Sequence, residues 1–165
     1  MEARINNIGV IGAGIMGIGI VQIAIQANHP DYLYDAQPNA AKNAYEKLTA
    51  TFSRLVEKNK ISQTEREQAL SNLHIVEDIQ ELHACDLIIE AIIEKLDIKQ
   101  TLMKQLESIV SPQCILASNT SSLSITEIAA ECQYPERVAG YHFFNPVPLM
   151  KVVEVIQGLH TDTQI

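Results

Sequence analysis

The sequence predicts an α/β fold in which a mostly parallel sheet is covered by helices on both faces. Short apolar segments rich in β-branched residues alternate with helical segments along the chain, as in sheets built from strand–helix–strand units. A glycine-rich turn joins the first strand to the first helix. Only the short segment NPVPLM separates the last two strands. We therefore expect an antiparallel strand at that edge of the sheet.

Length and composition exclude several classes of protein. A chain of 165 residues is long enough for one domain with a sizeable core and too short for two ordinary ones. The formal net charge is −8, and the 12 lysines and arginines form no stripe, which argues against a nucleic-acid partner. Cys85, Cys114 and Cys132 show neither disulfide nor metal-ligand spacing. We expect reduced thiols in a cytoplasmic protein and no metal site.

The uncharged run from Asn6 to Asn28 could be a membrane span, a secretion signal or the floor of a nucleotide site. Its five glycines are Gly9, Gly12, Gly14, Gly17 and Gly19, and the run also holds Gln22 and Gln26. These residues suit a spanning helix poorly. The basic flank is weak, and no small-residue cleavage site follows. The run is therefore better explained by a backbone that must turn sharply or approach a ligand.

The first supersecondary unit extends from Ile5 to Asp35. RINNIGVIG is a short strand that ends in glycines, and IMGIGIVQIAIQAN follows as a helix. Asn28 suits the C-terminal cap of this helix, and Pro30 prevents the helix from resuming. DYLYD is the second strand. Together they form a strand–helix–strand unit of the usual length, about 30 residues.

Two helices are expected next. PNAAKNAYEKLTATFSRLVEKNK is a long helical segment with Pro38 in its first turn. ISQTEREQALSNL follows as a second helix, for which Thr64 is the candidate N-cap. Because only a short polar link separates them, we expect a protruding helical hairpin.

The remaining elements complete the alternation. LHIVED and CDLIIEAI are buried strands separated by IQELHA, and EKLDIKQTLMKQLESIV is an amphipathic helix. Its expected inner face is Leu96, Thr101, Leu102, Leu106 and Ile109, with Lys, Gln and Glu outside. CILASNT is a strand, SITEIAAEC a short helix in which Ser124 and Glu127 have capping-box spacing, and RVAGYHFF and KVVEVI the last two strands.

The glycine turn has the pattern G-x-G-x-x-G, with Ile15 and Met16 between its last two glycines. Gly12 permits the tight turn, Gly14 lets a pyrophosphate approach the backbone, and Gly17 lets helix and strand pack closely. Asp35 ends the next strand at roughly the 20-residue spacing of an acid that holds the ribose hydroxyls. No arginine follows it, so NAD is favoured over NADP. The alternative is a turn that packs helix on strand without a ligand; the combination favours a Rossmann-type nucleotide site.

A second group of candidate residues lies near the end of the chain. His142 ends a predicted strand, and Glu154 lies on the next, where antiparallel pairing could bring an acid to the imidazole. Asn119 and Ser121, after the preceding strand, could bind a substrate oxygen or the nicotinamide. From spacing alone, a structural histidine and a solvated glutamate remain possible.

The sequence resembles the NAD-binding domain of the 3-hydroxyacyl-CoA dehydrogenase family, of the 3-hydroxybutyryl-CoA or 3-hydroxyadipyl-CoA dehydrogenase type. GVIGAGIMGIGI, YLYD, LIIEAIIE, ASNTSSLSIT and GYHFFNPVPLMKVVEV carry the resemblance, which covers nearly the whole chain. It implies NAD-dependent reversible oxidation of (S)-3-hydroxyacyl-CoA in fatty-acid β-oxidation or related acyl-CoA degradation. Residues 1–165 would form one NAD-binding domain, without the family's C-terminal helical domain, which builds a homodimer.

The resemblance also implies roles for individual residues. His142 would be the catalytic base, Glu154 its partner and Ser121 the group that binds the substrate's 3-oxygen. Asn119 and Asn145 would line the nicotinamide end, and Ala91, Glu94 and Lys99 would contact the cofactor. Thr51 and Lys58, on the hairpin, would contact CoA. Asn28-His29 stands where the family usually has Gly-His, and Asp31 stands where an apolar residue is common.

Two alternatives to this function stay open at this stage. One is a non-catalytic NAD-binding or structural relative on the same scaffold. The other is a dehydrogenase of a different β-hydroxy acid that does not use CoA. We further expect the isolated chain to bind NAD but to turn over poorly, because an open cleft cannot exclude water or position an acyl-CoA.

Overall fold

A computed structural model describes residues 5–165 and shows a seven-stranded sheet with the order β3-β2-β1-β4-β5-β6-β7. The first six strands are parallel, and β7 pairs with β6 in the antiparallel direction. The expected fold class and edge strand are confirmed. Because the order reverses between β2 and β4 on either side of β1, the topological switch point lies at the carboxyl ends of β1 and β4.

The first unit consists of β1 (Ile8–Ile11), α1 (Ile15–Gln26) and β2 (Asp31–Tyr34). The expected strand RINNIGVIG is longer than β1, and its Arg4 lies outside the described residues. Asn28 is left-handed, with φ of 64°. The N–H groups of Asn28 and His29 donate to the carbonyls of Ile25 and Ala24. This pattern is a Schellman motif, so the expected helix end is confirmed.

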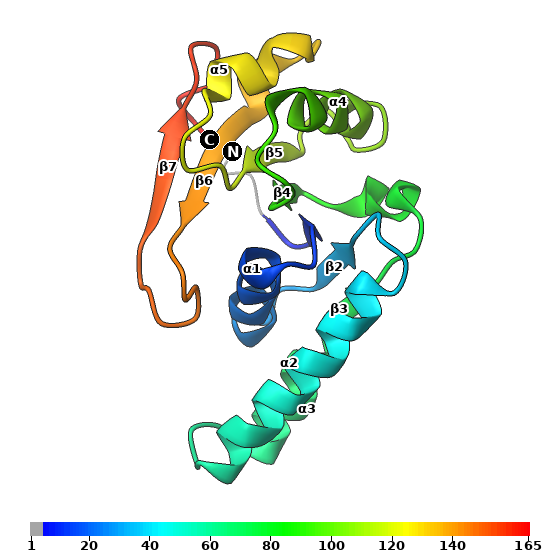
Figure 1. The fold of residues 1–165 in the computed structure, drawn as a ribbon, viewed down its shortest axis with the longest axis vertical. Helices are drawn as coiled ribbons and strands as arrows, with labels where there is room; N and C mark the ends of the chain where they lie inside the picture. Colours follow the sequence, from blue (N-terminus) through cyan, green and yellow to red (C-terminus); the bar gives the residue numbers. More distant parts are fainter. Residues whose placement is uncertain (1–4) are drawn as a thin grey trace.

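The hairpin consists of α2 (Ala40–Glu57) and α3 (Gln63–Ser71), which project together away from the sheet (Figure 1). The expected N-cap of α3, Thr64, is wrong. Ser62 caps the helix, because its hydroxyl accepts the Glu65 N–H while the Glu65 carboxylate accepts the Ser62 N–H. This reciprocal pair satisfies two N–H groups, which a cap at Thr64 could not do.

The middle of the chain forms β3 (Leu73–Ile75), the 3-10 helix η1 (Ile79–Ala84), β4 (Leu87–Glu90) and α4 (Leu96–Glu107). The expected inner face of α4 is partly wrong. Thr101 is exposed, whereas Lys99 and Met103 are buried together with Leu102 and Leu106. Lys99 is buried because a carboxylate at the end of β4 pairs with its ammonium group. Helical periodicity does not reveal such a partner.

The last part forms β5 (Ile115–Ser118), α5 (Ile125–Ile128), the 3-10 helices η2 (Ala129–Glu131) and η3 (Pro135–Arg137), β6 (Val138–Phe143) and β7 (Val153–Gln157). The Ser124 hydroxyl accepts the Glu127 N–H, as its spacing predicts. All five residues of β7 are exposed, as expected for an edge strand.

Two apolar cores cover the two faces of the sheet. One packs α1, α2 and α3 on strands β1 to β5 and includes Phe52, whereas the other packs η1, α4 and α5 on the opposite face and includes Met103. This is the doubly wound arrangement that the alternating strands and helices predict. Cys85 and Cys114 are buried free thiols, and Cys132 is a half-buried one.

One buried carboxyl interrupts the apolar packing. Asp31, the first residue of β2, is fully buried, and neither of its side-chain oxygens has a hydrogen-bond partner in the described part of the chain. Burial raises the pKa of the Asp31 carboxyl well above its usual range. Burial without a partner therefore disfavours the ionised form of the Asp31 carboxyl.

Candidate active site

The glycine turn lies at the switch point, between β1 and α1. Gly12 has φ of +107°, a conformation that side chains rarely adopt, and a Cβ there would lie 2.5 Å from the Ala91 carbonyl oxygen. A Cβ on Gly17 would lie 1.8 Å from the Gly12 carbonyl oxygen. These two glycines are required by the fold itself, as the turn geometry predicts.

Gly14 differs from its two neighbours in the turn. A Cβ there would meet nothing within 4 Å in the described structure, and its φ of −76° suits any residue. Gly14 is the N-cap of α1, and no side chain of the described residues caps the helix. The open space therefore faces free N–H groups at the positive end of a helix, which is where an anionic diphosphate binds.

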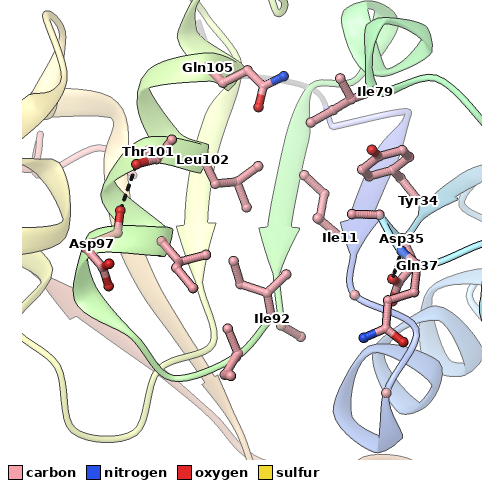
Figure 2. Close-up of a pocket in the computed structure, with 16 residues that line it drawn as sticks. Ile11, Tyr34, Asp35, Gln37, Ile79, Ile92, Asp97, Thr101, Leu102 and Gln105 are labelled. Carbon is pink, nitrogen blue, oxygen red and sulfur yellow. Dashed lines mark hydrogen bonds between the residues drawn. The ribbon is translucent and has the colours of Figure 1, made fainter.

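A cavity of about 640 Å³ extends from this turn (Figure 2). Asp35 lies at one end, and Gln105 of α4 lies at the other, with apolar side chains such as Ile11, Ile92 and Leu102 between them. The Asp35 carboxylate accepts the N–H groups of Ala13 (2.7 Å) and Gln37 (2.8 Å). It is thereby fixed at the mouth of an apolar cavity large enough for an adenosine moiety.

The other expected cofactor residues surround the same turn. Ala91 lines the cavity, and its carbonyl lies against Gly12. Ile15 begins α1 and is 77% exposed, whereas Met16 packs partly into the core beneath α1. The backbone of the turn, rather than these two side chains, therefore forms the floor of the site.

His142 and Glu154 are register partners on β6 and β7. His142 Nδ1 lies 2.9 Å from Glu154 Oε2, and the His142 ring also contacts the Phe144 ring, with the centroids 4.6 Å apart. The side chain of His142 is 20% exposed and that of Glu154 57% exposed. The sequence-based expectation that these two side chains meet is confirmed. The carboxylate engages Nδ1 and thereby fixes the orientation of the imidazole, so that Nε2 is the ring nitrogen that Glu154 does not contact.

Asn119 connects the end of β5 to the His142 strand. Its Oδ1 accepts the N–H of Phe143 at 2.9 Å, and its own N–H donates to the Glu90 carbonyl. Ser121, two residues later, is exposed on the same loop. Asn145 is exposed in the connection that follows β6. The structure thus places these three residues after the carboxyl ends of β5 and β6, and Asn119 is the one that bonds directly to the His142 strand.

A buried ionic network, which the sequence did not reveal as a unit, lies beneath this loop. Lys99 Nζ lies 2.7 and 2.8 Å from the two carboxylate oxygens of Glu90 and 3.2 Å from Glu94 Oε2. The hydroxyls of Ser118 and Thr120 donate to Glu90 and Glu94, respectively. Glu94 and Lys99 are expected site residues; Glu90, Ser118 and Thr120 are additions. A strand that ends in an acid, LIIE, is the signal that could have indicated Glu90.

The two carboxylates of this network have different electrostatic environments. Burial raises the pKa of Glu90, although the Lys99 ammonium and the hydrogen bonds oppose that shift. Burial also disfavours ionisation of Glu94, but the hydrogen bond from Thr120 and the Lys99 charge outweigh it, so the pKa of Glu94 is lowered. Glu94 is therefore a fixed negative charge at the rim of the site.

The two expected CoA contacts lie on the hairpin. Thr51 is half-buried within α2, and Lys58 is exposed at the C-terminal cap of α2. In Figure 1 the hairpin and the β6–β7 connection extend in the same direction from the sheet. Thr51 and Lys58 are therefore not among the residues around His142. They lie on the hairpin, which projects from the same side of the sheet as the β6–β7 connection.

Residues 5–165 include no helix that is long and apolar enough to cross a membrane. Within the same range, no cluster of three or more His, Cys, Asp or Glu side chains could hold a metal ion.

The fold and the site together define a dinucleotide-binding domain with a histidine–carboxylate pair near the carboxyl ends of its parallel strands. Comparison with known proteins gives the particular family. The sequence pattern of the 3-hydroxyacyl-CoA dehydrogenase NAD-binding domain matches residues 7–165. The chain belongs to this family, and the cofactor of the domain is NAD.

Individual relatives agree with this assignment. The chain is 44% identical over 165 residues to 3-hydroxyadipyl-CoA dehydrogenase of Escherichia coli, covering 100% of this chain and 35% of that protein. It is 40% identical over 162 residues to 3-hydroxybutyryl-CoA dehydrogenase of Bradyrhizobium diazoefficiens, covering 98% and 55%. A crystal structure of 3-hydroxybutyryl-CoA dehydrogenase from Escherichia coli superimposes with a TM-score of 0.96, at 44% identity, over 98% of this chain and 34% of that one. The chain thus spans between about a third and just over half of these relatives.

Proposed function

We propose that the protein catalyses the NAD-dependent, reversible oxidation of (S)-3-hydroxyacyl-CoA to 3-oxoacyl-CoA. The observation that carries this proposal is the contact of 2.9 Å between His142 and Glu154. His142 lies near the carboxyl end of β6, on the side of the sheet where the glycine turn follows the carboxyl end of β1. The family and the activities named for the relatives support it.

The residues of the chain fit NAD by three features: the open space at Gly14, the helix N-terminus beside it, and the fixed Asp35 carboxylate at the mouth of an apolar cavity. When bound, NAD accepts the hydride from the substrate carbon. The turn would hold the diphosphate, and Asp35 would accept hydrogen bonds from the adenosine ribose hydroxyls. Asp35 would also repel a 2′-phosphate, which favours NAD over NADP.

His142 would accept the proton of the 3-hydroxyl through Nε2 during oxidation and return it during reduction. Glu154 would stabilise the charged imidazolium that forms, and Ser121 would donate a hydrogen bond to the 3-oxygen as its charge changes. Acid–base assistance of this kind contributes about 10²- to 10⁴-fold to the rate. Asn119 and Asn145 would line the nicotinamide end, and Thr51 and Lys58 would contact the CoA moiety from the hairpin.

The test follows the absorbance of NADH during reduction of acetoacetyl-CoA. We expect turnover that free CoA inhibits. Binding of NADH without turnover by any length of the protein would favour a non-catalytic relative, and turnover of free 3-oxo acids without inhibition by CoA would favour a different β-hydroxy acid. We expect residues 1–165 alone to bind NADH but to turn over more slowly than a longer chain of the length of the relatives.

We also propose a homodimer for such a longer chain, a cytoplasmic location and no nucleic-acid partner. The three free thiols support a reducing compartment. The net charge of −8 argues against binding to nucleic acid.

A further inference from the structure

The loop that follows β5 is organised around the hydroxyl of Thr120. This residue is 4% exposed, and its Oγ1 accepts the N–H groups of Ser122 (3.3 Å) and Leu123 (3.0 Å). The same hydroxyl donates its proton to Glu94 Oε1. Ser121 lies between these bonded residues and is itself exposed. The backbone N–H of Ser121 also donates to the Glu94 carboxylate, so the position of Ser121 is set both by its chain neighbours and by Glu94.

Glu94 is held from the other side by Lys99. The Lys99 side chain is 1% exposed, and its ammonium faces three carboxylate oxygens, two from Glu90 and one from Glu94. An ammonium group has three protons to donate. These three oxygens match that number, so Lys99 holds the Glu94 carboxylate on the side opposite the Thr120 hydroxyl.

The network rests on β4, the central strand of the sheet. Glu90 ends β4 and is the register partner of Ile11 on one side and of Ser118 on the other. Ser118 donates its hydroxyl to Glu90 and accepts the Thr120 N–H at 3.2 Å. The loop is thus connected to the carboxyl ends of β4 and β5 in two ways. One is the hydrogen bond to Ser118, and the other runs through Glu94 and Lys99 to Glu90.

We propose that Thr120 is a positioning residue that fixes Ser121 relative to His142. This inference rests on the proposed function, because it concerns the group that meets the substrate oxygen. Thr120 acts by folding the loop around its hydroxyl, which also donates to the Glu94 carboxylate. A supporting group that locks a site side chain affects the rate through geometry, and misplacement by about 1 Å can cost about 10²-fold.

The main test compares Thr120→Val with Thr120→Ser in the protein that reduces acetoacetyl-CoA. Valine keeps the shape of threonine but lacks the hydroxyl, whereas serine keeps the hydroxyl. We expect Thr120→Val to lower kcat by about 10- to 100-fold with an unchanged KM for NADH. Thr120→Ser is expected to restore most of the turnover. Equal kcat values for the two variants would overturn the proposal.

A double-mutant cycle with Ser121→Ala tests whether Thr120 acts through Ser121. If it does, Thr120→Val lowers kcat much less in the Ser121→Ala background than in the wild type. Independent effects that multiply would overturn the inference. Amide hydrogen exchange at Ser122 and Leu123 provides a measurement without substrate: exchange should accelerate in Thr120→Val and not in Thr120→Ser.

If the wild-type protein does not reduce acetoacetyl-CoA, the proposed function fails as well. Turnover that is insensitive to Thr120→Val rejects the positioning role alone.

Discussion

His142 and Glu154 face each other as register partners on the only antiparallel pair of strands in the described sheet, with 2.9 Å between Nδ1 and Oε2. β7 is the edge strand of the sheet and β6 lies beside it, and a direct hydrogen bond joins the two side chains. Glu154 therefore fixes the orientation of the His142 ring through Nδ1.

We expect His142→Gln to lower kcat by about 10²- to 10⁴-fold and to leave NADH affinity unchanged, because glutamine cannot carry the proton. Glu154→Gln, which retains an acceptor but loses the charge, should cause a smaller loss. Steady-state kinetics and NADH fluorescence titration measure these effects. His160→Gln, at an exposed histidine, is the matched control. A loss of NADH binding in His142→Gln would place this residue in the cofactor site instead.

The glycine turn predicts opposite outcomes for two similar substitutions. Gly14→Ala should leave the free energy of unfolding within about 0.5 kcal/mol of the wild type, because its Cβ meets no protein atom within 4 Å. Its NAD affinity should fall by about tenfold, since the methyl group occupies the space for the diphosphate. Gly17→Ala should destabilise the fold by more than about 2 kcal/mol, because its Cβ would lie 1.8 Å from the Gly12 carbonyl oxygen. Urea unfolding and calorimetric titration check both; undiminished NAD binding by Gly14→Ala contradicts the assignment of the turn.

Asp35 should determine the preference for NAD over NADP. Asp35→Asn removes the negative charge at the mouth of the cavity but keeps an oxygen for one backbone N–H. We expect the ratio of NAD to NADP affinity to fall by about tenfold. Asp97→Asn, which neutralises another carboxylate lining the same cavity, controls for net charge and should leave the ratio unchanged. A similar change in both variants would show that general electrostatics, and not the ribose position, sets the preference.

Asp31 should make stability depend on pH. In the unfolded chain this carboxyl ionises near pH 3.9, whereas the raised pKa in the folded state keeps the proton to higher pH. The unfolded state therefore binds fewer protons between the two values, and stability falls as the pH rises through that window. Burial without a partner adds a cost of about 1–3 kcal/mol.

We accordingly expect Asp31→Val to be more stable than the wild type, by an amount that grows from pH 5 to pH 8 in urea unfolding. Asp31→Asn keeps the shape of the side chain and does not titrate. Its free energy of unfolding should therefore not change with pH through this residue, while the cost of burying a polar group without a partner remains. A constant difference between wild type and Asp31→Val across this range would mean that the carboxyl has a partner in solution.

Local signals in the sequence accounted for most of the fold. Asn28 followed by Pro30 marked the end of α1, because a left-handed residue and a missing N–H act within one turn of helix. The same reasoning could have placed the N-cap of α3 at Ser62, since Ser62 and Glu65 have capping-box spacing. The prediction of Thr64 is therefore wrong, although the capping-box spacing of Ser62 is visible in the sequence.

Burial of single side chains was less accessible to sequence reasoning. Periodicity placed Thr101 inside and Lys99 outside, because a lysine on a helix is normally solvated. Lys99 is buried since Glu90 lies within 2.7 Å of its ammonium, and Glu90 belongs to a strand whose neighbours are fixed by the sheet order. No feature of the helix sequence contains that information.

The sequence by itself determined the order of strands and helices, the nucleotide turn and the identity of the residues around His142, because each depends on residues close together in the chain or on a family pattern. The tertiary structure alone decided which charged side chains meet beneath the β5 loop, where the buried Glu90 and Lys99 lie next to Glu94 at the rim. It also decided that Asp31 is buried without a hydrogen-bond partner among the described residues. The physical reason is that the cost of burying a charge depends on partners from distant segments, and only the folded chain brings those partners within hydrogen-bond distance.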